Sequence, residues 1–280
     1  APRRRCRCRN RGERGAGGGI LGGVFEWLKR FRGAARKLSL PVREDRTGRN
    51  TVAIDLKPYT PDAKTFLGQL AYLQLSQFEI LTNELKYSPN TEYKSHLSEA
   101  AATSFEKYRL IAKKISQLGI DPTDAMDPFV ERIETFHSFT APTDWHESVM
   151  KVYLVSGMLD EFYTRLAVGL DAGTRSEVVK ALSNKAYEKF AVEVLQQSMK
   201  ADPQLGSKLA LYGRRLMGDV LLEIRAAFDN RKLAGVAKSK VLTPEEEREA
   251  NLAAYAKLEP LITELNAAHS LRMDALGLTA

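Results

Sequence analysis

The sequence contains few of the residues on which covalent cross-links and most metal sites depend. Only two of its 280 residues are cysteines, Cys6 and Cys8, and only four are histidines. One residue separates the two cysteines within a run of arginines, so they are too close to staple a fold and supply half a zinc site at best. Such cysteine usage is typical of the reducing cytoplasm, and we expect a cytoplasmic protein without structural disulfides.

Long hydrophobic segments are also missing. No apolar run reaches the roughly 18 residues that a membrane-spanning helix needs, and the basic N-terminal region lacks the apolar stretch of a secretory signal. Residues 15–23 are rich in glycine but lack the pattern of a phosphate-binding loop. There is no G-x-S-x-G segment, and both cysteines lie near the N-terminus, so no hydrolase nucleophile is indicated.

Charge is distributed unevenly along the chain. Residues 1–50 contain 15 lysines and arginines against 4 acidic residues, a net charge of +11. The remaining 230 residues contain 27 against 31, a net charge of −4, and the two values add up to the total of +7. The basic character therefore belongs to the N-terminal region, and a nucleic-acid-binding surface over the whole protein is not supported.

The N-terminal region divides into two parts. Residues 1–23 have many arginines and glycines but few large apolar side chains, so we expect them to be disordered. They are either an arm that contacts RNA phosphates or an inert tail upstream of a true start near Val24. Residues 24–60 are predicted to form a basic amphipathic helix, at 24–40, and a linker. That helix would lie on an anionic surface or a partner, or pack on its own bundle.

From Pro61 onward, the hydrophobic spacing is that of helices. We assign a helical bundle to residues 61–231 and a linker with a C-terminal helix to residues 232–280. Helices of 26 to 28 residues would be about 40 Å long, and one long connection at 119–143 is typical of a bundle with a crossover. The helices are expected near 62–87, 91–118, 144–169, 174–201, 205–231 and 244–275, with Thr243 as the capping residue of the last.

Several separated segments carry a family resemblance. They are Leu118–Pro122, Ala125-Met126, Pro128–Val130, Phe136-His137, Thr140–Pro142, Asp144-Trp145, Phe190–Val192, Leu209–Arg215 and Arg272–Gly277. In this order they resemble ferritin-like proteins of actinobacterial type, which are grouped with the hydroxylase of the 2-methylthio-isopentenyl-adenosine of tRNA. The resemblance covers about three quarters of the chain. It implies an all-α fold: a ferritin-like four-helix bundle with a long crossover connection and extra C-terminal helices.

A di-iron centre in such a bundle needs a carboxylate from each of two helices and a Glu-x-x-His pair from each of the other two. The resemblance puts the two pairs at Ser104-x-x-Lys107 and Asn184-x-x-Tyr187. Serine is a poor iron ligand, and a charged lysine repels a metal ion. We therefore interpret these four positions as a degenerate site and expect neither a metal nor another cofactor.

Four carboxylates would be needed if iron binding survived. Glu79 is the candidate in the first helix. In the third helix Asp160 and Glu161 are adjacent candidates, of which we choose Glu161, and Glu106 and Glu193 would have to turn inward from the second and fourth. One Glu-x-x-His does occur, at residues 134–137, but it lies in the long connection, and we interpret it as a decoy with local hydrogen bonds.

Two main functions remain open at this point, besides a membrane-surface adaptor that would use the basic helix at 24–40. The first is a non-catalytic binding or scaffold protein without a cofactor, whose partner is RNA, another protein or, in a homo-oligomer, a second copy of the chain. The alternative is a non-haem di-iron monooxygenase that uses iron to hydroxylate a modified tRNA nucleoside or a small molecule. Elemental analysis for iron would separate the two.

Overall fold

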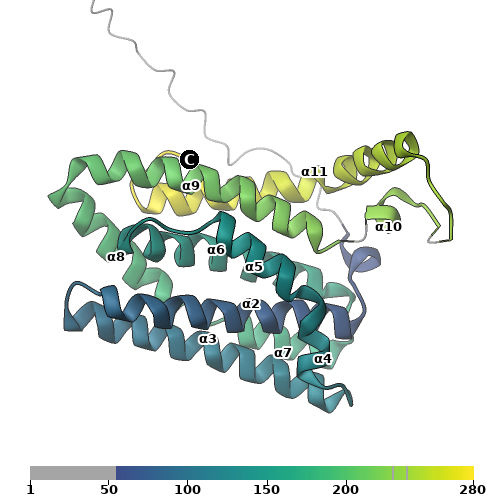
Figure 1. Cartoon of the computed structure of the whole chain (residues 1–280), viewed down its shortest axis with the longest axis horizontal. Coiled ribbons are helices and arrows are strands. Elements are labelled where there is room, and N and C mark those ends of the chain that lie inside the picture. The colour runs from purple at the N-terminus through teal and green to yellow at the C-terminus, as the bar shows by residue number, and fades with distance from the viewer. Residues whose placement is uncertain (1–54, 229, 238) are drawn as a thin grey trace, which may run out of the picture. The chain divides into compact units, whose positions relative to one another are not determined.

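The computed structural model describes residues 55–228, 230–237 and 239–280, and this part of the chain is helical without strands (Figure 1). The all-α class predicted from the sequence is therefore confirmed. The predictions of a disordered tail at 1–23 and of an amphipathic helix at 24–40 fall outside the described residues.

Most helices begin at a side-chain cap, because the first N–H groups of a helix have no partner within it. Asp62, Asn90, Asp144, Asp171 and Asp202 each accept a hydrogen bond from the first turn that follows. The long helices are α2 (Ala63–Glu84), α3 (Thr91–Gln117), α6 (Trp145–Leu166), α7 (Ala172–Leu182), α8 (Ala186–Ala201), α9 (Pro203–Ala226) and α11 (Pro244–Ala275). The short ones are η2 (Lys57–Tyr59), η3 (Leu85–Tyr87), α4 (Pro122–Met126), η4 (Asp127–Phe129), α5 (Val130–Phe139), η5 (Ala167–Gly169) and α10 (Asn230–Ala234).

Helix α6 is the centre of the fold. It is buried along almost its whole length, including the charged residues Glu147, Lys151 and Asp160. On one side it packs with α2, α3 and the α7–α8 pair as a four-helix bundle, and on the other it packs against α9 and the second half of α11 (Figure 1). Its interior-facing residues therefore decide what chemistry the bundle centre offers.

The predicted single helix at 174–201 is wrong, because the structure divides it into α7 and α8. The break lies at residues 183–185, where the Ser183 hydroxyl and N–H both donate to the carbonyl of Lys180. Such local side-chain hydrogen bonds compete with the helix. Val178 is buried and Val179 is exposed, since α7 packs on α3 in its own register.

The crossover connection contains α4 and α5, and α4 crosses α2 at Gly68. A Cβ atom at Gly68 would overlap the carbonyl oxygen of Ala125. We expect Gly68→Ala to lower the free energy of unfolding by about 1–3 kcal/mol, since backbone at the contact has to move. Urea unfolding would measure this. The matched control is Gly218→Ala on α9, where nothing lies within 4 Å and alanine should stabilise the helix by up to about 1 kcal/mol.

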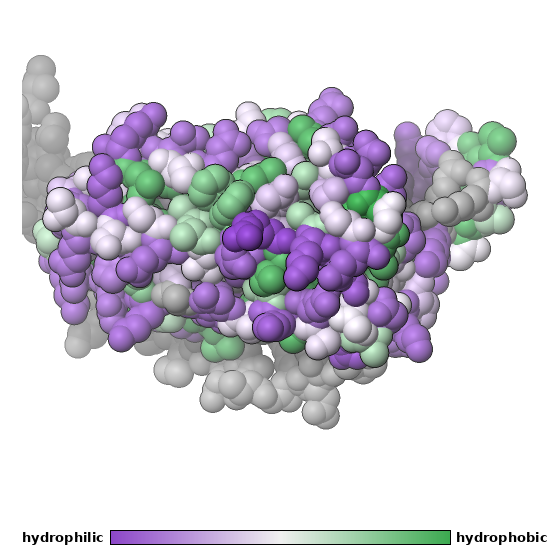
Figure 2. Space-filling model, turned by 90° about the horizontal axis from the view of Figure 1, so that it is seen from below, coloured by the Kyte–Doolittle hydropathy of each residue, from purple (hydrophilic) through white to green (hydrophobic). Residues whose placement is uncertain are grey.

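Within the described residues, no helix combines the length and the hydropathy that a membrane span requires. Figure 2 shows a face on which hydrophilic residues predominate and hydrophobic ones form small separate patches. Isolated exposed apolar residues are normal on protein surfaces. A single exposed apolar residue is therefore not by itself evidence of a binding face.

Candidate functional site

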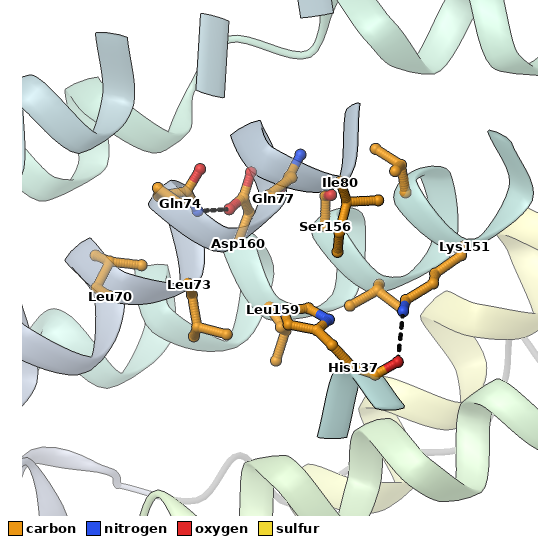
Figure 3. A pocket seen from close by; sticks show the side chains of 12 residues that line it. Leu70, Leu73, Gln74, Gln77, Ile80, His137, Lys151, Ser156, Leu159 and Asp160 are labelled. Atoms are coloured by element: carbon orange, nitrogen blue, oxygen red, sulfur yellow. Dashed lines mark hydrogen bonds between the residues drawn. The ribbon is translucent and has the colours of Figure 1, made fainter. Parts of the chain in front are cut away.

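A buried ion pair occupies the centre of the four-helix bundle. The ammonium of Lys107 on α3 donates to Oδ2 of Asp160 on α6 at 2.7 Å, and each side chain is only 7% exposed. On α2, Nε2 of Gln74 donates to the other carboxylate oxygen at 3.2 Å (Figure 3). The register of α3 explains the position of Lys107, because the helix turns Leu97, Ser104 and Lys107 to the same buried side.

The four positions interpreted as degenerate ligands lie around one cavity beside this pair. The cavity measures about 30 Å³ and is lined by Ser104, Lys107, Asn184 and Tyr187 together with Asp160. Ser104 and Lys107 are buried, and the hydroxyl of Tyr187 donates to the carbonyl of Val149 at 3.2 Å. Asn184 is exposed at the α7–α8 break. The structure thus brings together residues that are up to 83 positions apart in the sequence.

The donor chemistry of this cavity does not fit a pair of iron ions. Such a pair needs several carboxylates to balance its charge inside a core, and here Asp160 already pairs with an ammonium. Burial raises the pKa of Asp160, whereas the nearby Lys107 and Gln74 act in the opposite direction. Across the described part of the chain, no group of three or more His, Cys, Asp or Glu side chains is placed to hold a metal ion.

The four candidate carboxylates are not brought together. Glu79 is exposed, Glu106 pairs with Arg109 at 3.1 Å, and Glu193 pairs with Lys189 at 3.8 Å, all towards solvent. The remaining candidate, Glu161, turns towards α11 and away from the bundle centre.

Glu161 belongs to a polar contact between α6 and α11. Its carboxylate accepts from Arg165 at 2.7 Å and lies 3.3 Å from Arg272. Arg272 also donates to the carbonyl of Gly157 at 2.9 Å, in space that a Cβ at Gly157 would fill. Successive helical residues point about 100° apart, so the adjacent Asp160 is the inward acid. Asp160 and Glu161 are adjacent candidates in the sequence, and the structure turns Asp160 rather than Glu161 towards the buried ammonium of Lys107.

A second polar group lies under α5, the helix of the crossover. Oε1 of Glu134 accepts from the hydroxyl of Tyr72 at 2.6 Å, and Nε2 of His137 lies 3.0 Å from Oγ of Ser76. The hydroxyl of Ser76 donates its proton to the carbonyl of Leu73 at 3.1 Å, so Nε2 of His137 is the donor in its hydrogen bond with Ser76. Burial lowers the pKa of His137 to about 3, which keeps the ring neutral.

Lys151 lies beside this group and was not identified from the sequence. It is 3% exposed, and its ammonium donates to the backbone carbonyl of His137 at 3.2 Å (Figure 3). Burial lowers its pKa to about 8, although the carboxylates of Glu134 and Glu84 act in the opposite direction. Both Lys151 and His137 line a cavity of about 20 Å³, which is room for about one water molecule.

The other end of α5 carries a third buried group. Arg132 donates to Oε1 of Gln69 at 3.0 Å and lies 3.1 Å from the carboxylate of Glu223 on α9. The hydroxyl of Tyr163 donates to the same Gln69 oxygen at 3.1 Å. Burial raises the pKa of Glu223 to about 7, despite the neighbouring guanidinium. These contacts connect α5 with α2, α6 and α9. They do not place a nucleophile beside a general base, so they indicate a structural role.

A family model described as the ferritin-like domain of actinomycetes matches residues 58–238. The match covers well over half of the chain, so the protein belongs to this family of ferritin-like domains. The predicted ferritin-like class is confirmed, and the family description itself names no reaction. No curated protein matches the chain.

Proposed function

We propose that this protein is a non-catalytic ferritin-like bundle that works as a binding or scaffold protein, with the ammonium of Lys107 in the place of metal ions. The observation that carries the proposal is the Lys107–Asp160 pair, with its atoms 2.7 Å apart and both side chains buried. We further propose descent from the tRNA-hydroxylase-like group, on the resemblance of its separated sequence segments.

Electrostatics supports the exclusion of a metal ion from the cavity. Two unit charges 4 Å apart interact with about 4 kcal/mol at an effective dielectric constant of 20, and a divalent ion doubles this value. An incoming cation would meet that repulsion from Lys107, while the carboxylate of Asp160 is already neutralised. The packing of the bundle does not need the metal, since an ammonium satisfies the buried acid.

The size of the interior also favours a binding role over hydroxylation. The two cavities that reach Asp160 measure about 20 and 30 Å³, whereas substrate pockets usually measure about 300–1,000 Å³. A modified nucleoside could not reach the bundle centre without a rearrangement of α2, α3 or α8. We therefore place the working surface on the outside of the bundle.

Iron analysis of the purified full chain tests this proposal. We expect far less than one iron per chain after expression in iron-supplemented medium, and no saturable uptake of ferrous iron under anaerobic conditions. A known di-iron protein expressed in the same medium controls for the supply of metal. About two irons per chain, the stoichiometry of a di-iron bundle, would overturn the proposal and return the alternative of a hydroxylase.

A further inference from the structure

The first half of α11 has one buried side and one exposed side. Its buried side, which includes Ala250, Ala254 and Leu258, is covered in part by α10, and Lys257 donates to the carbonyl of Leu233 there (Figure 1). The opposite side exposes Leu252 by 70% and Tyr255 by 50%. These two large apolar side chains therefore lie on the exposed side of a helix whose opposite side is already packed against the protein.

Acidic residues outnumber basic ones around the two exposed side chains, where Arg248 is the one basic residue on the same side of the described helix. Glu245 and Glu249 precede them and Glu259 follows, all on the exposed side. Within the described residues, Glu246 pairs with Lys240 at 2.9 Å, whereas Glu245, Glu249 and Glu259 pair with no lysine or arginine. We call Glu245, Glu249, Leu252, Tyr255 and Glu259 the outer stripe of α11; at 1.5 Å per residue it is about 21 Å long.

A backbone acceptor adds to the negative character of the outer stripe. Pro260 lies inside α11 and has no N–H, so the carbonyl of Ala256 lacks its ordinary helical donor. Ala256 is exposed beside Leu252. A carbonyl oxygen in this position accepts from a lysine or arginine that approaches the stripe.

We propose that the outer stripe of α11 is a docking face for a basic amphipathic helix of a partner protein. This rests on the proposed function, because it gives the binding protein its binding face. Leu252 and Tyr255 would contact the apolar side of the partner helix, and the three glutamates would pair with lysines or arginines that flank it. Three glutamates against Arg248 leave this side of the helix with a net negative charge, which favours a basic partner helix over an acidic one.

The probe is a labelled synthetic amphipathic helix of about 14 residues, with leucines on one side and lysines on the other. A peptide with the same spacing of leucines and with glutamates in place of the lysines is its counterpart. We expect fluorescence anisotropy to show salt-sensitive binding of the Leu/Lys peptide to the full chain. Leu252→Ser with Tyr255→Ser, and separately Glu245→Lys with Glu249→Lys and Glu259→Lys, should each weaken binding by about tenfold or more. All of these positions are exposed, and circular dichroism would verify folding.

Leu222→Ser is the matched control. Leu222 on α9 is 64% exposed, like Leu252, but Arg225 and Arg215 lie near it on the same helix. Peptide binding should be unchanged in this variant. The inference is overturned if the Leu/Glu peptide binds equally well, if the stripe variants bind as the unaltered protein does, or if ultracentrifugation shows that the stripe instead joins two copies of this chain. Iron content measured on the same preparation separates this failure from a failure of the proposed function.

Discussion

Lys107→Met is expected to lower the free energy of unfolding by about 3–5 kcal/mol, because it leaves the charge of Asp160 buried without its partner. The double variant Lys107→Met with Asp160→Leu should recover most of this loss, since replacing both members of a buried pair by apolar residues of similar size is often neutral or stabilising. Urea unfolding of the three proteins would measure both differences.

A surface pair serves as the control for this experiment. Lys185 and Glu188 lie 3.5 Å apart near the mouth of the same cavity, with side chains 50% and 35% exposed. Lys185→Met should cost less than about 1 kcal/mol, as is usual for exposed ion pairs. Equal effects of Lys107→Met and Lys185→Met would show that the central pair is not the buried neutralising contact inferred from its geometry.

Acidification is expected to destabilise the protein steeply, because two histidines are buried in the neutral form. Burial lowers the pKa of His137 to about 3 and that of His269 to about 4, from 6.5. Below pH 6.5 the unfolded chain therefore binds protons that the folded chain does not bind. The free energy of unfolding falls as the pH is lowered from 6.5 towards the folded-state pKa values of about 4 and about 3. At 1.36 kcal/mol per pKa unit, the largest losses are about 5 kcal/mol for His137 and about 3 kcal/mol for His269.

Glu223 opposes this trend. Its pKa of about 7 lies above the ordinary value of 4.5, so the folded state takes up a proton first and gains about 3 kcal/mol as the pH falls from 7 to 4.5. Chemical unfolding between pH 4 and 8 would resolve the two contributions. His269→Leu should flatten the acid side of the profile, and Glu223→Gln should steepen it. An unchanged slope in His269→Leu would contradict the assignment.

The helices could be predicted from the sequence because their ends are marked by local chemistry. Asp62, Asn90 and Asp144 precede apolar periodic segments, and α2, α3 and α6 begin at the next residue after each. At Thr243 the capping box with Glu246 confirms the expected start of α11. The division of α7 from α8 is hard to predict because the break at residues 183–185 contains no glycine or proline, and only the weak helix formers Ser183 and Asn184 indicate it.

Only one part of the site could be predicted from the sequence, namely a charged residue on the apolar side of its helix. Lys107 is that residue, because it lies on the apolar stripe of its helix. Its partner Asp160 lies 53 residues away on α6, and the choice between Asp160 and Glu161 depends on how α6 rotates against α3. Lys151 on α6 and His137 on α5 meet through the packing of these two helices, a tertiary arrangement that no local pattern encodes.

The central ammonium also has a consequence for how this protein depends on its surroundings. In a metal-loaded bundle, the bound ion adds to stability by mass action and is lost when a chelator or starvation lowers its free concentration. Lys107 is joined to the backbone by covalent bonds, so a chelator cannot remove the group that pairs with Asp160. Under the proposed function, the bundle would therefore keep the same fold whether the cell is rich or poor in iron.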